Sequence, residues 1–255
     1  MKLFAQSYGS GTPLIILHGL FGSLDNWHTL SKRFAADFRV FAIDQRNHGR
    51  SPHDDTFTYT AMAEDLVEFF DDNELPEASL LGHSMGGKTA MEFALAHPER
   101  VTKLVVVDIA PRAYAPHHDA LLDALCSVDL SAYRTRREVD DALADRIPSV
   151  PVRSFLIKNL RRSEDGTLSW KMNLPVLRES YDEVNRAITP GRVFSRPVLF
   201  IRAQGSPYIA ASDRNSILSL FPMAQIVDFD TGHWVHAESP EPFHRTVTAF
   251  LKGTP

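Results

Sequence analysis

The chain has 255 residues, 44% of them hydrophobic, with 27 basic and 32 acidic side chains and a formal net charge of −5. This length can bury one large core and is generous for a single domain without an insertion. The charges are spread without a long run of one sign, which argues against nucleic acid or an anionic membrane as the partner. We therefore expect a small-molecule substrate and a monomer or small homo-oligomer.

The terminus and the cysteine content bear on location. The first residues, "MKLFAQSYGSGTP", lack the apolar run of a secretory signal, and no segment approaches the roughly 18 apolar residues that span a bilayer. Cys126 is the only cysteine, so no disulfide can form within the chain, and we expect a buried structural thiol there. These features predict a cytoplasmic protein with no stable membrane association.

Short apolar runs alternate with helical patterns along the chain. The runs are rich in Val, Ile and Leu, as expected of parallel strands covered on both faces. The predicted strands are 13–19, 39–45, 78–84, 102–111, 197–204 and 224–230. Helical spacing is clear at 60–72 and 88–98. The alternation predicts an α/β fold with a mostly parallel, doubly wound sheet.

One long stretch, 112–192, breaks this alternation. It contains helical patterns and turn signals, the last of them "TPGR" at 189–192, but no convincing strand. Its clearest helical patterns lie at 118–128 and 135–147. We predict a core domain formed by 1–111 and 193–255, with 112–192 inserted as a helical cap, or lid, over the carboxyl edge of the sheet.

A candidate nucleophile follows the strand at 78–84. The segment Gly82-His83-Ser84-Met85-Gly86 is a G-x-S-x-G pattern, in which a sharp strand-to-helix turn raises the serine above the sheet. The two glycines have no Cβ atom, and a Cβ at either position would collide with the chain in so tight a turn. We predict that Ser84 is the nucleophile; the alternative is an ordinary helix N-cap.

A nucleophilic serine needs N–H donors for the oxyanion that forms when it attacks a carbonyl. The backbone N–H of Met85, at the start of the helix, is one predicted donor. The second is expected from the loop after the first predicted strand, where we assign Leu20, with Phe21 as its competitor. His18 in the same loop is predicted to be a structural hydrogen-bonding residue.

The predicted general base follows the last predicted strand. His233, in "DTGHWVHAE", lies in a loop from which a ring nitrogen can accept the Ser84 proton while the other donates to a carboxylate. His236 competes, but it is expected to enter the final helix. Glu238 is interpreted as a carboxylate at a helix start rather than a triad member.

These motifs carry a family resemblance. "HGLFGSLDNW", "DQRNHGRS", "GHSMGG" and "GHWVHAE", in this order, resemble the α/β-hydrolase superfamily over essentially the whole chain, and with "VVVDIAP" they look like the bacterial YbfF-type esterases. The resemblance implies an acyl-ester or thioester hydrolase without a cofactor. Asn47 stands where relatives usually have glycine, and Asp44, Arg46 and His48 are interpreted as holding that turn together.

The position of the acid is the main question left by this resemblance. In most members of the superfamily the acid follows the strand that ends here in "FIRAQ", but this chain has Ser206 in that loop and no carboxylate. Asp213 lies nearby, at what reads as a capped helix start, so we expect it to point to solvent. Asp230 is too close to His233 in sequence to reach the far ring nitrogen comfortably.

Asp108 is the acid that we predict. It ends the apolar strand after the nucleophile helix, at the sheet edge where ligands bind, and some relatives carry their acid there. The order Ser84, Asp108, His233 is typical of the fold. The alternative is that Asp108 only organises the cap entrance. Ser206 is then a candidate support, with its hydroxyl holding Asp108 or His233.

The cap is expected to close over Ser84 and form an apolar pocket. The candidate wall residues, which could equally be packing residues, are Leu20, Phe21, Phe155, Leu156, Trp170, Met172 and Trp234. A basic cluster within the cap could receive the phosphates of an acyl-CoA or form a solvated helix face; it comprises Arg153, Lys158, Arg161 and Arg162. His117 and His118 have no third ligand at suitable spacing, so we predict no metal site.

The predicted function is that of a serine carboxylesterase or thioesterase that forms an acyl-enzyme on Ser84. The nearest enzymatic alternative is hydrolysis of a carbon–carbon bond with the same three residue types. An alternative of another class is a non-catalytic ligand-binding protein on this fold, since fold alone does not imply activity. The loop at Ser206, which lacks a carboxylate, favours that alternative, whereas Ser84, His233 and the oxyanion loop argue against it.

Overall fold

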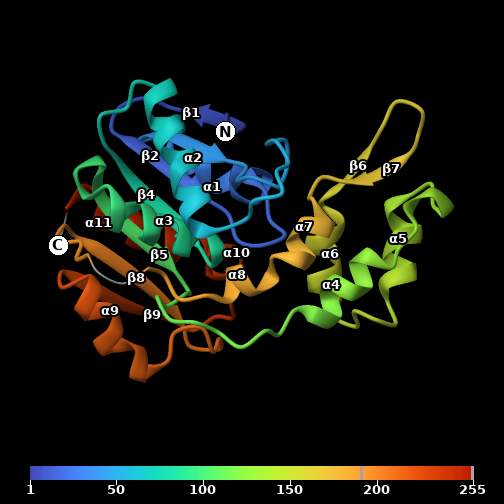
Figure 1. The fold of residues 1–255 in the computed structure, drawn as a ribbon. Helices are drawn as coiled ribbons and strands as arrows, with labels where there is room; N and C mark the ends of the chain where they lie inside the picture. The colour runs from blue at the N-terminus through green and yellow to red at the C-terminus, as the bar shows by residue number, and fades with distance from the viewer. Residues whose placement is uncertain (190–191, 254–255) are drawn as a thin grey trace.

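The computed structural model describes residues 1–189 and 192–253 and contains a seven-stranded sheet in the order β1-β3-β2-β4-β5-β8-β9 (Figure 1). Every neighbouring pair in this sheet is parallel except β1 with β3. The strands are β1 (Ala5–Tyr8), β2 (Pro13–Leu17), β3 (Arg39–Ile43), β4 (Ala78–His83), β5 (Val101–Val107), β8 (Val198–Ala203) and β9 (Ala224–Phe229). The predicted fold class and all six predicted strands are confirmed. Strand β1 was not predicted, because four partly polar residues at a sheet edge give no apolar run.

Helices cover both faces of this sheet. The α-helices of the core are α1 (His28–Phe34), α2 (Tyr59–Asp72), α3 (Met85–Ala96), α9 (Arg214–Leu220), α10 (Val235–Glu238) and α11 (Pro240–Lys252). Short 3₁₀ helices lie at Leu24–Trp27, Pro98–Arg100, Leu130–Ala132 and Ala211–Asp213. Alternate residues of β2 point to opposite faces: Ile15 packs with α2 and α3, whereas Ile16 packs with α1 and α11. The two predicted core helices correspond to α2 and α3.

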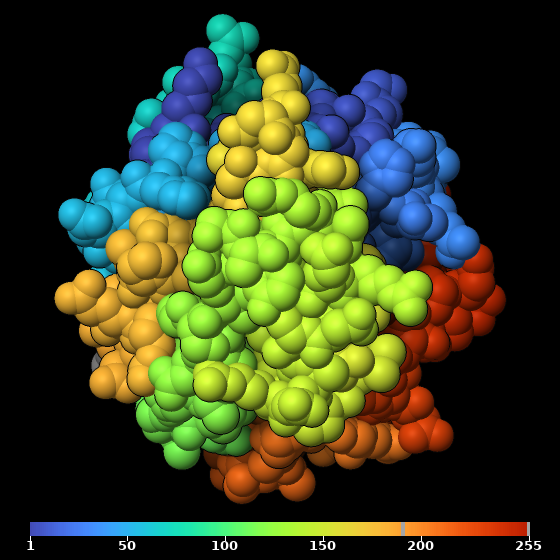
Figure 2. Space-filling view, turned by 90° about the vertical axis from the view of Figure 1, so that its right-hand side faces the viewer, coloured from blue at the N-terminus to red at the C-terminus, as the bar shows by residue number. Residues whose placement is uncertain are grey.

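The inserted segment forms a separate layer at one end of the molecule (Figure 1). Its helices are α4 (Asp119–Cys126), α5 (Arg136–Leu143), α6 (Val150–Ile157), α7 (Leu174–Glu179) and α8 (Tyr181–Asn185). An apolar cluster joins them to Phe21, Tyr59 and Met85 of the core. Figure 2 shows this green and yellow layer spread over one face of the molecule. We keep the name cap for residues 112–192; its boundary remains a prediction, and residues 190 and 191 of the predicted "TPGR" turn lie outside the described residues.

Two expectations about the cap are wrong. It contains an antiparallel hairpin of β6 (Leu160–Arg162) and β7 (Leu168–Trp170), whose three-residue strands are too short to give a recognisable period. Cys126 is exposed at the end of α4 rather than buried. Within residues 1–189 and 192–253, no helix combines the length and apolar character needed to cross a membrane.

Candidate active site

Ser84 lies on a sharp turn between β4 and α3. Its backbone has φ 53° and ψ −119°, a strained conformation for a residue with a Cβ. The glycines are required by contact: a Cβ on Gly82 would lie 2.1 Å from the Gly86 carbonyl oxygen, and a Cβ on Gly86 would lie 2.5 Å from the Leu17 carbonyl oxygen. The turn therefore holds the half-buried Ser84 hydroxyl at the carboxyl edge of the sheet.

Asp108 and His233 form a hydrogen-bonded pair beside this turn. The His233 Nδ1 lies 2.7 Å from the Asp108 Oδ2, and the Asp108 carboxylate is fully buried. The Asp108 Oδ1 accepts a hydrogen bond of 3.1 Å from the Ala203 N–H. The backbone of Asp108 has φ 49°, so the chain leaves β5 in a strained turn that directs this carboxylate toward the loop of His233. Because Nδ1–H donates to Asp108, the Nε2 lone pair is available as a proton acceptor.

The other candidate acids lie elsewhere. Asp213 is buried rather than solvent-facing: its carboxylate accepts hydrogen bonds from Arg112 Nε at 2.9 Å and from the Ala210 N–H at 2.8 Å. The expectation failed because an arginine distant in sequence covers this helix start. Asp230 is exposed. Among the three carboxylates that we considered, only Asp108 contacts His233.

Ser206 does not make the contacts expected of a triad support. Its hydroxyl accepts a hydrogen bond of 3.4 Å from the Tyr208 N–H and forms none with Asp108 or His233. His236 is buried and stacks on Trp27, with ring centroids 4.3 Å apart and an interplanar angle of 13°. Burial, with a smaller contribution from His233, lowers the pKa of His236 to about 3, so it is neutral near pH 7.

The loop that carries His233 is held by polar groups on both sides. Glu238 lies in the single turn of α10, as a carboxylate at a helix start, and accepts hydrogen bonds from the Gly232 N–H at 2.7 Å and the Trp234 N–H at 3.3 Å. The Nε2–H of His83 donates to the His233 carbonyl oxygen at 3.0 Å. Glu238 and His83 thus fix three backbone groups around His233. The sequence did not predict this role for either residue.

The oxyanion loop distinguishes Leu20 from Phe21. The Phe21 N–H donates to the Nε2 of His48 at 3.3 Å, and the His48 Nδ1–H donates to the Arg46 carbonyl oxygen. Burial lowers the pKa of His48 to about 3, which keeps this ring neutral and able to accept. Leu20 N–H has no protein acceptor within residues 1–189 and 192–253. The unbonded N–H supports Leu20 as the donor.

His18 has the structural role predicted for it. Its Nε2 accepts a hydrogen bond of 3.0 Å from the Gln45 N–H, and its Nδ1–H donates to the Gly19 carbonyl oxygen at 2.9 Å. Burial lowers the pKa of His18 to about 4, consistent with a neutral ring. The Asp44 carboxylate accepts hydrogen bonds from the Leu24 and Arg50 N–H groups. These contacts tie the oxyanion loop to the turn that follows β3.

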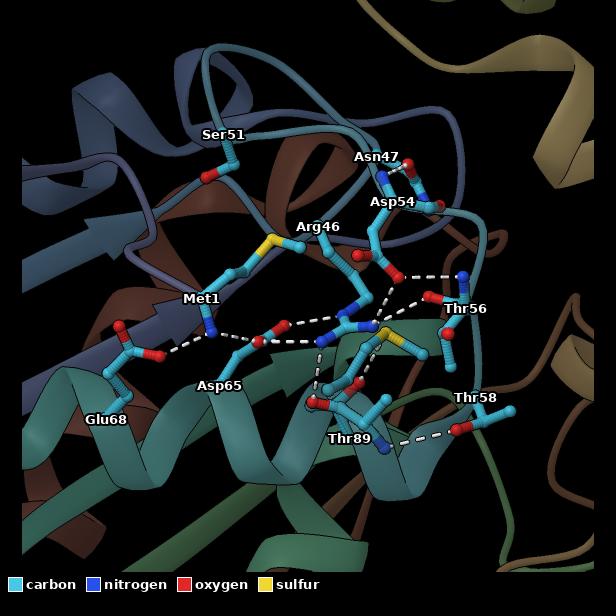
Figure 3. A network of polar contacts seen from close by, with 12 residues as sticks. Met1, Arg46, Asn47, Ser51, Asp54, Thr56, Thr58, Asp65, Glu68 and Thr89 are labelled. Atoms are coloured by element: carbon cyan, nitrogen blue, oxygen red, sulfur yellow. Dashed lines mark hydrogen bonds and ion pairs between the residues drawn. The ribbon is translucent and has the colours of Figure 1, made fainter.

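An ion pair anchors that turn to α2. Figure 3 shows the Arg46 guanidinium donating to both carboxylate oxygens of Asp65, at 2.6 and 2.8 Å, while the amino group of Met1 binds the same carboxylate at 2.7 Å. Asn47 has φ 63°, a left-handed conformation that asparagine tolerates and glycine adopts freely. Asn47 therefore serves this turn without requiring a glycine.

A cavity of about 270 Å³ opens at Ser84 and His233. Of the predicted wall residues, Leu20, Phe21, Phe155, Leu156 and Trp234 line this cavity. Trp170 and Met172 do not; both pack in the apolar cluster of the cap instead. Tyr208 was missed: its ring lies 4.3 Å from the His233 ring, in the loop where the sequence offered only Ser206 for interpretation. The cavity is mainly apolar, and both Ser84 and His233 line it.

The four basic residues of the cap behave mainly as the solvated face that was the alternative to a phosphate site. Arg153 is buried and pairs with Asp140 at 2.8 Å, whereas Lys158, Arg161 and Arg162 are exposed. The sequence pattern could not show that an acid on α5 would neutralise Arg153. The two adjacent histidines bind tyrosines: His117 Nε2 lies 2.5 Å from the Tyr208 hydroxyl, and His118 Nδ1 lies 2.8 Å from the Tyr181 hydroxyl.

A serine on a strand-to-helix turn, a histidine hydrogen-bonded to a buried carboxylate and an apolar cavity under a helical cap define the class of serine-dependent hydrolases on an α/β scaffold. The profile of the alpha/beta hydrolase fold matches residues 12–154. The chain belongs to this α/β-hydrolase family, which confirms the resemblance predicted from its motifs.

Individual relatives extend over almost the whole chain. The chain is 36% identical over 250 residues to "Esterase YbfF" of Escherichia coli (strain K12), covering 97% of this chain and 96% of the relative. It is also 36% identical to "sn-1-specific diacylglycerol lipase ABHD11" of Xenopus laevis, with 95% of this chain and 80% of the relative covered. A solved structure named "Marine microorganism esterase" superposes with a TM-score of 0.95 at 43% identity, covering 98% of this chain and 99% of that one.

Proposed function

We propose that the protein is a serine esterase that cleaves small acyl esters through an acyl-enzyme on Ser84. The observation that carries the proposal is the hydrogen bond of 2.7 Å between His233 and the buried Asp108. Asp108 is thus an acid in contact with His233, although the loop at Ser206 has none. The lack of an acid in that loop was the main argument for interpreting the protein as a non-catalytic binding protein. An ester-hydrolysing activity agrees with relatives named esterase and lipase.

The chemistry proceeds in two acyl transfers. The Nε2 of His233 accepts the Ser84 proton as the hydroxyl oxygen attacks the ester carbonyl. The N–H groups of Leu20 and Met85 stabilise the oxyanion, and Asp108 stabilises the imidazolium. His233 then returns the proton to the alcohol oxygen, which leaves, and the same residues direct a water to the acyl-enzyme. The products are the alcohol and the free acid, and Ser84 is regenerated.

Oxygen esters fit the site better than acyl-CoA thioesters. The cavity is mostly apolar, and Arg153 of the predicted phosphate-binding cluster is already paired with Asp140 inside the cap. A CoA thioester would require cations at the cavity mouth for its phosphates. Uncharged esters need only apolar contact and the two oxyanion donors.

A fluorophosphonate probe tests the proposal directly, because Ser84 must attack phosphorus and displace fluoride for the label to attach. We expect folded wild type to be labelled and to hydrolyse p-nitrophenyl acetate, and Ser84→Ala to do neither. Ser79→Ala is the matched control, since this buried serine of β4 lies outside the site and bonds to Thr102. Unlabelled, inert but folded wild type would contradict the proposal.

A further inference from the structure

A second, smaller cavity adjoins Ser84. It has a volume of about 30 Å³ and shares Leu20, Ser84, His118 and Tyr208 with the larger cavity. Its remaining walls are Tyr59, Met85, Ile109, Tyr114, His117, Val184 and Asn185. His233 lines only the larger cavity. The nucleophile is therefore bordered by two spaces that differ in size and in access to the histidine.

The walls of the small cavity are fixed by hydrogen bonds. The hydroxyl of Tyr59, itself buried, donates to the Val184 carbonyl oxygen at 2.7 Å and so joins α2 to the cap. The hydroxyl of Tyr114 donates to the Tyr208 carbonyl oxygen at 2.6 Å. Enlarging the cavity would break these partly buried bonds, and each hydroxyl would lose its acceptor.

A buried lysine reinforces the same walls. Lys88, one turn after Ser84 on α3, is almost completely buried, and its ammonium lies 4.8 Å from the Tyr114 ring centroid and 5.5 Å from that of Tyr59. It donates to the carbonyl oxygens of Asn185 and Arg186 at the end of α8. The lysine thus links both tyrosines to the cap segment that carries Val184.

The chemistry assigns each cavity to one part of an ester. In the tetrahedral intermediate the leaving oxygen must lie within reach of His233, because that residue returns the proton. The alcohol therefore extends into the larger cavity, and the acyl substituent must use the space that His233 does not line. A cavity needs about 10–15 Å³ of such volume for one water molecule, so 30 Å³ has room for about two groups of that size.

We infer that the small cavity is the acyl site and that it selects acetyl and propanoyl esters of bulky apolar alcohols, with Val184 as a specificity-determining residue. The inference rests on the proposed esterase function and adds its substrate class. Longer acyl chains require either displacement of the cap segment at Val184 or loss of the bonds made by Tyr59 and Tyr114.

Matched valine truncations in the two cavities test this assignment. Val184→Ala enlarges the small cavity and Val152→Ala the large one, and both side chains are only partly buried. The measurement is kcat/KM for p-nitrophenyl acetate, butanoate and octanoate, with folding checked by thermal denaturation. We expect wild type to prefer acetate over octanoate by at least about tenfold, since one methylene in a tight pocket is worth about 10- to 200-fold.

Val184→Ala should raise the butanoate-to-acetate ratio about tenfold, and Val152→Ala should leave that ratio within about twofold. A wild-type preference for octanoate, or a shift of the ratio by Val152→Ala instead of Val184→Ala, would overturn the assignment. If Val184→Ala does not fold, the wild-type chain-length profile decides. Absence of all hydrolysis together with failure of fluorophosphonate labelling would instead contradict the proposed function itself.

Discussion

The loops of the core and the helices of the cap are held in place by different forces. Around the oxyanion loop and His233, buried polar groups such as Asp44, His48 and Asp108 each bond to a backbone N–H or to another side chain. The cap is held chiefly by an apolar cluster, with ion pairs such as those of Arg178 near its surface. Directional bonds fix atomic positions, whereas apolar packing fixes only shape and volume. The positions of Ser84, Asp108 and His233 are thus fixed by the core, and the cap contributes walls to both cavities.

The largest expected contrast between these regions is in stability. Arg46→Met leaves the Asp65 carboxylate buried with only the Met1 amino group as a cationic partner, and we expect a loss of about 3–5 kcal/mol in the free energy of unfolding. Arg178→Met removes partly exposed pairs with Asp119 and Asp123 and should cost less than about 1 kcal/mol. Urea unfolding measures both. Equal losses would contradict the contrast.

A smaller effect is expected on turnover when the loop of His233 is loosened. Glu238→Ala frees the Gly232 and Trp234 N–H groups, so His233 should sample positions away from Ser84 and kcat should fall about tenfold with little change in KM. The matched control is Glu241→Ala. Glu241 lies in the next helix, α11, and forms an exposed ion pair with Arg33. Unchanged kcat in Glu238→Ala, with its pH profile intact, would show that the loop needs no such clamp.

A further prediction concerns acid stability. The buried histidines of the core have folded pKa values below the ordinary 6.5: about 4 for His18 and about 3 for His48 and His236. Below pH 6.5 the unfolded chain binds protons that the folded chain does not, so this stability is present above pH 6.5 and is lost as the pH falls toward 4 and then 3. The free energy of unfolding should therefore decrease over this range.

His236→Phe isolates one of these protons. The substituted ring can keep the stack on Trp27 and removes the buried His236 Nδ1, which has no hydrogen-bond partner within the described residues. We expect a change of less than about 1 kcal/mol at pH 7.5 and, between pH 6 and 4, a slope shallower by up to about 1.4 kcal/mol per pH unit. Urea titrations at several pH values measure both quantities; an unchanged slope would mean that His236 takes up no extra proton on unfolding.

The sequence predicted what local rules determine. The elbow at Ser84 follows from its glycines, and the place of Asp108 follows from the end of an apolar strand at the sheet edge. The contacts that were missed depend on how the chain folds back on itself: Arg112 covers Asp213 from 101 residues away, Asp140 of one cap helix pairs with Arg153 of the next, and Glu238 turns back to the Gly232 N–H six residues before it. Contacts of this kind leave no periodic pattern or characteristic spacing in the sequence, so they could not be predicted from it.

Pocket residues of the cap were only partly predictable for the same reason. Phe155 and Trp170 are both aromatic residues in amphipathic segments, yet Phe155 lines the cavity and Trp170 packs inside the cap. The hairpin that carries Trp170 was not visible in the sequence, so the direction of its side chain was not predictable. In the core, by contrast, sheet topology alone brings Ser84, Asp108 and His233 to one edge.

The central claim is that Asp108 is the acid of the triad. Its most direct test is the turnover of Asp108→Asn on p-nitrophenyl acetate beside Asp230→Asn, which changes an exposed carboxylate three residues before His233. An asparagine keeps the size of the side chain but no longer selects the His233 tautomer with a free Nε2. We predict a loss of about 10³ to 10⁴ in kcat for Asp108→Asn and nearly full activity for Asp230→Asn. A folded Asp108→Asn enzyme with nearly wild-type turnover would contradict this assignment.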